Sequence, residues 1–141
     1  MSMSIRAILE KDEKEPMDDH DLDDAIWLSL CERISSPEHL KHFQPQVAVF
    51  YASYLMEHEV GNGGFAQAAM NIPEWFELAA EAYHALEKSA VASLIMKVYQ
   101  QLSKNEKIAR KFRSGEIQWE DYFADHSFNV YDKLVYESNE W

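Results

Sequence analysis

The sequence predicts an all-α protein that folds as a single compact domain of about six to eight helices. Apolar residues recur at helical spacing in several segments, and no run alternates strictly between apolar and polar residues as a half-buried strand does. Four glycines and four prolines are too few for the frequent turns of a β-sandwich or barrel. With 141 residues, of which 47% are hydrophobic, the chain is long enough to bury one core.

An acidic N-terminal arm over residues 1–20 is expected to be partly mobile and to contribute to partner binding, ahead of a helical domain over residues 21–141. Between residues 10 and 24 only Met17 and Leu22 are apolar. Such a stretch buries too little surface to offset the entropy lost on ordering. The apolar residues that could dock this arm have helical spacing: Ile5, Ile8 and Leu9.

The first helix of the domain is expected to start at a cap formed by Asp21 or Asp23 and to run to about Ile34. Short acidic side chains accept hydrogen bonds from the free N–H groups at a helix N-terminus, and their charge suits the helix dipole. The sequence Ser35-Ser36-Pro37 is expected to end this helix.

Four further helices are expected in the rest of the chain, together with two shorter ones. The strongest prediction covers residues 45–60, where few positions are polar, and Gly61-Asn62-Gly63-Gly64 then breaks the helix before a short one at 65–70. The other expected helices follow from apolar spacing, from Pro73 at a first turn and from Ser89 as a cap. They cover residues 73–87, 90–103 and 127–139, with a short basic helix at 105–113.

The charge is strongly negative and unevenly distributed. The net charge is −12, composed of −12 in residues 1–87, +6 in residues 88–113 and −6 in residues 114–141. Direct binding to a DNA duplex is therefore not expected, since that affinity comes from Lys and Arg contacts to phosphates. Basic proteins are the favoured partners, and the alternative interpretation is that the charge only keeps the chain soluble.

Composition also excludes several classes of protein. Cys31 is the single cysteine, so an intramolecular disulfide and a cysteine-based zinc site are both excluded. No run approaches the roughly 18 apolar residues of a membrane helix, and the N-terminus does not resemble a signal peptide. We therefore expect a cytoplasmic protein.

No metal, cofactor or catalytic residue is expected. His39 and His42 are three residues apart, but they match no metal-binding motif, and we interpret them as surface residues. Glu57, His58 and Glu59 are consecutive, so on a helix they point in different directions. The least favoured hypothesis is a small hydrolase-like enzyme that would use Glu59 and a histidine.

The most specific stretch of the sequence surrounds the glycines after residue 60. We interpret it as a structural corner between two helices, in which Asn62 bonds locally to the backbone and Glu59 accepts hydrogen bonds from the first N–H groups of the second helix. Phe65 would enter the core. The residues assigned to this corner are Glu59, Asn62, Gly63, Gly64, Phe65, Gln67 and Asn71. A ligand pocket there is the less favoured alternative.

This pattern, Glu-x-x-Asn-Gly-Gly-Phe-x-Gln-x-x-x-Asn over residues 59–71, resembles the signature of a bacterial all-helical family to which a DNA-mimic protein belongs. The resemblance extends over residues 22–140 and includes a closing segment with aspartates ahead of the last helix. It implies a helical fold. The DNA-mimic member is acidic and dimeric, and it occupies the DNA-binding surfaces of a helix-turn-helix repressor and of a histone-like protein. The basic segment 88–113 departs from what a DNA mimic is expected to present.

The first hypothesis for function is therefore an acidic, DNA-mimic-like module that binds a basic DNA-binding protein, with a homodimer compatible with the family. The carboxylates assigned to the partner surface form two rows: Asp18, Asp19, Asp21, Asp23 and Asp24, and Glu74, Glu77 and Glu81 at helical spacing. The alternative is an immunity or antitoxin-type inhibitor that recognises one cognate partner through a specific patch. Sensitivity of the complex to salt separates the two, since only charge mimicry weakens steeply with salt.

Overall fold

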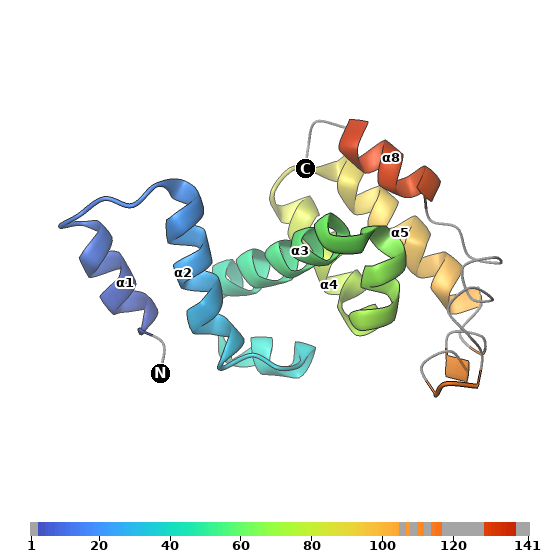
Figure 1. Cartoon of the computed structure of the whole chain (residues 1–141), viewed down its shortest axis with the longest axis horizontal. Helices are drawn as coiled ribbons and strands as arrows, with labels where there is room; N and C mark the ends of the chain where they lie inside the picture. Colours follow the sequence, from blue (N-terminus) through green and yellow to red (C-terminus); the bar gives the residue numbers. More distant parts are fainter. Residues whose placement is uncertain (1–2, 105–106, 108–109, 112–113, 117–128, 138–141) are drawn as a thin grey trace. The chain divides into compact units, whose positions relative to one another are not determined.

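The predicted all-α class is confirmed: every regular element that the computed structural model describes is a helix (Figure 1). The structure describes residues 3–104, 107, 110–111, 114–116 and 129–137. In these ranges no helix is both long and apolar enough to span a bilayer. The chain divides into two compact units, residues 1–47 and 48–141. The separate arm over residues 1–20 stays a prediction.

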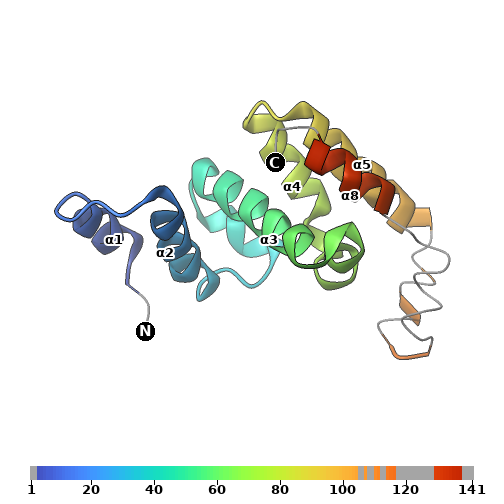
Figure 2. The same ribbon diagram turned by 45° about the horizontal axis from the view of Figure 1, so that its top comes forward.

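The first unit contains two α-helices and a 3₁₀ helix: α1 (Ile5–Asp12), α2 (Asp19–Cys31) and η1 (Pro37–His42). The hydroxyl of Ser4 caps α1 by accepting the N–H of Ala7 at 3.2 Å. Helices α1 and α2 lie side by side and contact each other (Figures 1 and 2). The apolar residues buried in this unit are Ile8, Leu30, Ile34 and Leu40.

The predicted start of α2 was wrong by a few residues. Asp18, not Asp21 or Asp23, is the N-cap, and its Oδ1 accepts the N–H of Asp21 at 2.9 Å. Several aspartates compete for this role, and a cap needs extended backbone at its own position, which Asp18 has at φ −69° and ψ 161°. The helix ends at Cys31, before the predicted Ile34, although Ile34 still donates its N–H to the carbonyl of Leu30.

The second unit is organised around α3 (Pro45–Asn71), whose first residues lie at the end of the first unit. It continues through η2 (Pro73–Trp75), α4 (Phe76–Ala85), α5 (Ser89–Lys104) and α8 (Asn129–Glu137). These bounds agree with the predicted helices at 73–87, 90–103 and 127–139 to within two residues. The predicted helix over 105–113 lies largely outside the described residues.

Helices α4 and α5 form a hairpin that supplies much of the core of the second unit, and α8 packs against α5 (Figure 2). The turn between α4 and α5 is closed by the N–H of Lys88, which donates to the carbonyl of Tyr83 at 2.8 Å, and it places Glu87 at φ 61°. Burial and the nearby Glu57 carboxylate raise the pKa of Tyr83, whose hydroxyl donates to the carbonyl of Ser53 at 3.4 Å. This bond ties α4 to α3.

The core of the second unit is built from large apolar side chains with less than 2% of their surface exposed. They are Met56, Val60, Phe65, Phe76, Val91, Ile95 and Val98. Removing side chains of this size from water contributes about 1.5–3 kcal/mol each. Aromatic contacts join the helices, with ring centroids 5.3 Å apart for Tyr51 and Trp75 and 6.5 Å apart for Phe76 and Tyr99.

Candidate functional site

The predicted corner between two helices is present inside α3. Helical geometry continues to Asn62 and is interrupted at Gly63 (φ −159°, ψ 21°) and Gly64 (φ 73°, ψ −175°), and a second helical segment begins at Phe65. Gly64 adopts a left-handed conformation that side chains with a Cβ disfavour. The glycines therefore allow the chain to turn sharply, and the corner places Phe65, fully buried, in the core.

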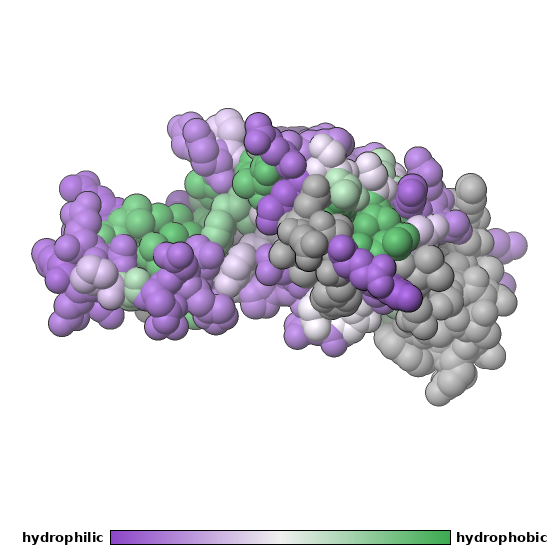
Figure 3. All heavy atoms as spheres, turned by 90° about the horizontal axis from the view of Figure 1, so that it is seen from above, coloured by the Kyte–Doolittle hydropathy of each residue, from purple (hydrophilic) through white to green (hydrophobic). Residues whose placement is uncertain are grey.

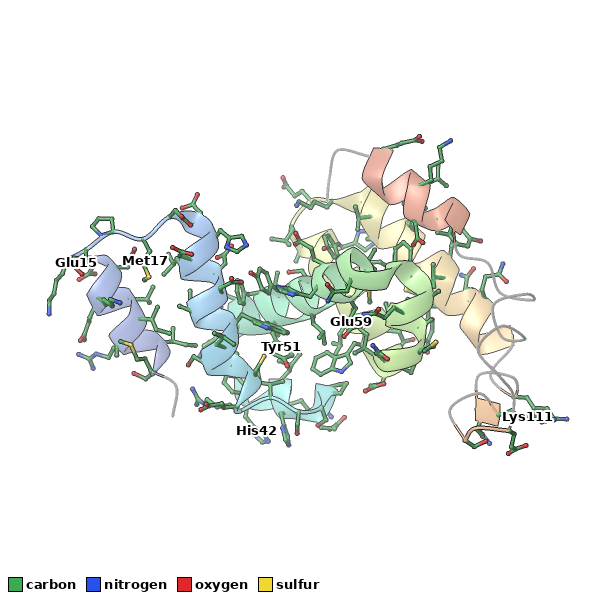
Figure 4. All side chains as sticks on the ribbon, viewed as in Figure 1. Glu15, Met17, His42, Tyr51, Glu59 and Lys111 are labelled. Carbon is green, nitrogen blue, oxygen red and sulfur yellow. The ribbon has the colours of Figure 1, made fainter. Side chains whose placement is uncertain are left out.

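Three of the motif residues meet at one carboxylate. The Oε2 of Glu59 accepts hydrogen bonds from Nε2 of Gln67 at 3.1 Å and from Nδ2 of Asn71 at 3.0 Å. Glu59 lies on α3 just before the corner (Figure 4), while its two donors lie on the segment after it. A hydrogen bond to a charged group contributes about 1.5–3 kcal/mol, which is more than a neutral one contributes. Glu59 thus holds the two arms of the corner together.

Glu59 was predicted to accept the backbone N–H groups at the start of the second segment. This prediction was wrong, because another residue accepts the N–H of Phe65. Asp132 of α8 places its Oδ1 2.7 Å from the N of Phe65. Burial raises the pKa of the Asp132 carboxyl, and the hydrogen bond from Phe65 opposes that shift. Sequence reasoning missed Asp132 because it lies 67 residues from Phe65. The sequence feature that could have pointed to Asp132 was the closing segment with aspartates, which is part of the family resemblance.

Each glycine of the corner leaves room for one polar side chain. A Cβ on Gly63 would lie 2.8 Å from the Cβ of Gln67, and a Cβ on Gly64 would lie 2.9 Å from the Cγ of Asp132. Real Cβ atoms do not approach other atoms this closely. Two side chains therefore explain why both positions are glycine: Gln67 of α3 lies against Gly63, and Asp132 of α8 lies against Gly64. The predicted local hydrogen bond of Asn62 was wrong, because this residue is exposed and its side chain has no hydrogen-bond partner among the described residues.

Replacing Gly63 with valine is expected to lower the free energy of unfolding by about 1 kcal/mol or more. The branched side chain would displace Gln67, and this would weaken its hydrogen bond to Glu59. Thermal and urea unfolding of the purified variant provide the measurement. An unchanged melting temperature together with loss of partner binding would show that the corner is a contact site rather than a structural one.

The contacts of Glu59 do not assemble a proton-transfer pair. General acid–base catalysis needs an acid or base within hydrogen-bond reach of its partner, and the described donors to Glu59 are amides, which do not titrate in this role. The neighbouring His58 has its ring 4.6 Å from that of Tyr54, on the same helix. The arrangement at Glu59 accordingly suits a structural role.

The two predicted acidic rows lie in different compact units. Glu74 on η2 and Glu77 and Glu81 on α4 are all exposed, and none of the three forms an ion pair with another described residue. In the first unit Asp18, Asp19 and Asp21 are exposed, whereas Asp23 and Asp24 are half-buried. Asp24 Oδ2 lies 3.5 Å from Nδ1 of His20, and Asp18 is engaged as the cap of α2. We call Glu74, Glu77 and Glu81 the glutamate row. Its carboxylates have fewer described intramolecular partners than the carboxylates of the aspartate row.

The histidines considered as metal ligands have separate surroundings. His39 and His42 are both exposed on η1, and Nδ1 of His39 accepts the N–H of Ser35 at 3.2 Å. Within the part of the chain that the structure describes, no three His, Cys, Asp or Glu side chains are grouped to hold a metal ion.

Comparison with protein families gives one match, to the DMP19-like protein family over residues 41–141. The match covers well over half of the chain and includes the corner, the glutamate row and α8. It begins later than the resemblance at residue 22, so α1 and α2 lie outside it. Neither the curated proteins nor the solved structures contain a significant match. On the evidence of its matched length and its corner motif, the chain belongs to the DMP19-like protein family.

Proposed function

We propose that this protein is a non-enzymatic, acidic binding module that occupies the DNA-binding surface of a basic protein, such as a helix-turn-helix repressor or a histone-like protein. Family membership and the net charge of −12 support the proposal. The proposal places the protein in the cytoplasm and is compatible with a homodimer. It rests on the surface carboxylates, because a fold by itself does not determine function.

The observation that carries the proposal is the exposed row formed by Glu74, Glu77 and Glu81. At about 1.5 Å of rise per helical residue, the row presents one charge per roughly 5 Å. One DNA strand carries one charge per about 3.4 Å of axis. The row therefore reaches about two-thirds of the charge density of a single strand, and its carboxylates have no described cation to neutralise them.

The alternative function, inhibition of one cognate partner through a specific patch, predicts a different response to salt. Charge mimicry depends on many exposed carboxylates, and interactions between exposed charges are screened over about 10 Å at 0.1 M salt. A patch that combines apolar and polar contacts retains most of its affinity under the same conditions. Measuring the dissociation constant for a purified histone-like protein from low to high salt separates these two functions.

Replacing Glu74, Glu77 and Glu81 together with glutamine is expected to weaken binding to the histone-like protein by at least about tenfold at low salt. Loss of three charges also makes the salt dependence shallower, because fewer ions are displaced on binding. Glutamine keeps the size of each side chain, and the three positions are exposed, so the fold is expected to stay intact. Isothermal titration calorimetry at several salt concentrations provides the measurement.

A matched variant replaces three other exposed glutamates of the second unit, Glu87, Glu116 and Glu137, with glutamine. It makes the same change in net charge but leaves the glutamate row intact. Equal weakening by both triple variants would mean that only total charge matters and that the row is not the partner surface. No binding by the unmodified protein at low salt would contradict the proposed function itself.

A further inference from the structure

The glutamate row continues along α4 into a histidine. Its members are separated by three and then four residues, and three residues after Glu81 the chain places His84. Glu77, Glu81 and His84 all lie within α4, so around the helix axis His84 is about 20° from Glu77 and about 60° from Glu81. All three side chains are exposed. The next position of the row is therefore held by a side chain that can change its charge.

The side chain of His84 is not used by the fold. In the part of the chain that the structure describes, it forms no hydrogen bond, ion pair or ring contact. The nearest cation along the chain, Lys88, has its Nζ 6.0 Å from the ring centroid of Tyr83. No described charged group in the elements and turn around α4 forms an ion pair with His84: Glu74 on η2; Glu57, His58 and Glu59 on α3; Glu87 and Lys88 in the turn; and Lys97 on α5. The ring is thus free to meet a partner.

A titratable position distinguishes this row from other polar surface. Hydrophilic side chains are common on the face of the molecule that Figure 3 shows, so polarity alone does not mark a partner surface. Histidine normally changes charge between pH 5 and 8, whereas carboxylates, lysines and arginines normally keep theirs over this range. A proton on His84 changes the summed charge of the row and His84 from −3 to −2 and places a cation at its end.

The sign of the effect on binding follows from linkage. A basic partner that lies against the row brings positive charges close to His84, and these oppose its protonation. The free protein then binds more protons at this position than the complex does. Affinity consequently falls as the pH falls through the range in which histidine titrates, and it levels off on either side of that range.

We propose that His84 makes the binding of the basic partner dependent on pH, with the neutral ring allowing the partner's Lys and Arg side chains against the glutamate row and the protonated ring weakening that contact. The inference rests on the proposed function for the surface and for the basic nature of the partner. It adds a regulatory position to that surface, through which acidification loosens the complex.

The test measures the dissociation constant of the full chain for the histone-like protein at low salt, by isothermal titration calorimetry at about pH 7.5 and about pH 5.5, on either side of the ordinary histidine range. The unmodified protein is expected to bind about threefold or more weakly at the lower pH, because the row loses one unit of negative charge to a repelling cation. His84→Gln carries no titrating group, and the ratio of its two dissociation constants is expected to be clearly smaller. The partner's own titration is common to all variants and cancels when these ratios are compared.

Two further variants sharpen this test. His84→Lys carries a permanent positive charge, and at the higher pH it is expected to bind about threefold or more weakly than the unmodified protein, with a reduced dependence on pH. His42→Gln is the matched control, since His42 is an exposed histidine on η1, outside the glutamate row, and we expect this variant to keep the full pH dependence. All positions are exposed, so the fold is expected to persist, which thermal unfolding checks.

The outcomes separate the inference from the proposed function. The same pH dependence in His84→Gln and in the unmodified protein would overturn the inference, because other groups would then carry it. Binding at the higher pH that depends on the glutamate row but is as tight in His84→Lys would also overturn it and leave the proposed function standing. Tighter binding at the lower pH that is lost in His84→Gln would show that the protonated ring meets an acidic group, which is the opposite of the inference. No binding by the unmodified protein at either pH would contradict the proposed function and the inference with it.

Discussion

Replacing Gly64 with alanine is expected to lower the free energy of unfolding by about 2–6 kcal/mol, the sum of two costs. Gly64 has φ 73° and ψ −175°, a backbone conformation that is essentially restricted to glycine and costs a residue with a Cβ about 1–3 kcal/mol. A Cβ there would also lie 2.9 Å from the Cγ of Asp132. The carboxylate must move away, and the buried N–H of Phe65 then loses its acceptor, at a cost of about 1–3 kcal/mol. Urea unfolding of the purified variant measures the sum.

Gly61→Ala is the matched control for this experiment. Gly61 lies in the helical part of α3, and a Cβ added to it would have nothing within 4 Å, so alanine is expected to stabilise the protein by up to about 1 kcal/mol. A double variant, Gly64→Ala with Asp132→Gly, is expected to lose less than the sum of the single losses, because the clash is absent in it. Equal stabilities of Gly61→Ala and Gly64→Ala would contradict the structural role of the corner.

The sequence was sufficient to predict most helices because their apolar residues repeat with helical spacing and their ends carry breakers. The interruption of α3 follows from Gly63-Gly64 and the start of η2, directly before α4, follows from Pro73, because these residues act on their immediate neighbours. The exposure of Glu77 and Glu81 was likewise predictable, since both lie opposite the apolar stripe of their own helix. These features all depend on interactions within a few residues.

Features that depend on distant residues were not predictable from the local pattern. The sequence around Phe65 contains nothing that identifies Asp132 as its acceptor, because only the packing of α8 brings the two together. Glu59 was expected to accept hydrogen bonds from backbone N–H groups, but its carboxylate instead accepts the side-chain amides of Gln67 and Asn71. The 3₁₀ helix at Pro37–His42 was also missed, since a helix this short has no apolar period to detect.

Replacing Asp132 itself separates the hydrogen bond from the charge. Asp132→Ala removes the acceptor of the Phe65 N–H, and we expect it to lower the free energy of unfolding at neutral pH by about 1–3 kcal/mol. Asp132→Asn keeps the size of the side chain and an oxygen that can accept the same bond, and it removes a charge that burial disfavours. We therefore expect this variant to stay within about 1 kcal/mol of the unmodified protein. Losses of the same size in both variants would show that the charge itself is required.

The difference in free energy of unfolding between the unmodified protein and Asp132→Asn is expected to depend on pH, and the sign of that dependence follows from the pKa of Asp132. Burial raises the pKa of Asp132 in the folded protein above its ordinary value, so between these two pKa values the folded state binds more protons than the unfolded state. The contribution of Asp132 to the free energy of unfolding consequently rises as the pH falls through the raised pKa, and it levels off below the ordinary pKa of an aspartate. Relative to Asp132→Asn, which does not titrate, the unmodified protein is expected to gain stability on acidification across that window. Urea unfolding of both proteins from neutral pH downward measures this, because the contributions of the other carboxylates cancel in the difference. A relative loss of stability on acidification would instead mean that the hydrogen bond from Phe65 outweighs burial and lowers the pKa of Asp132.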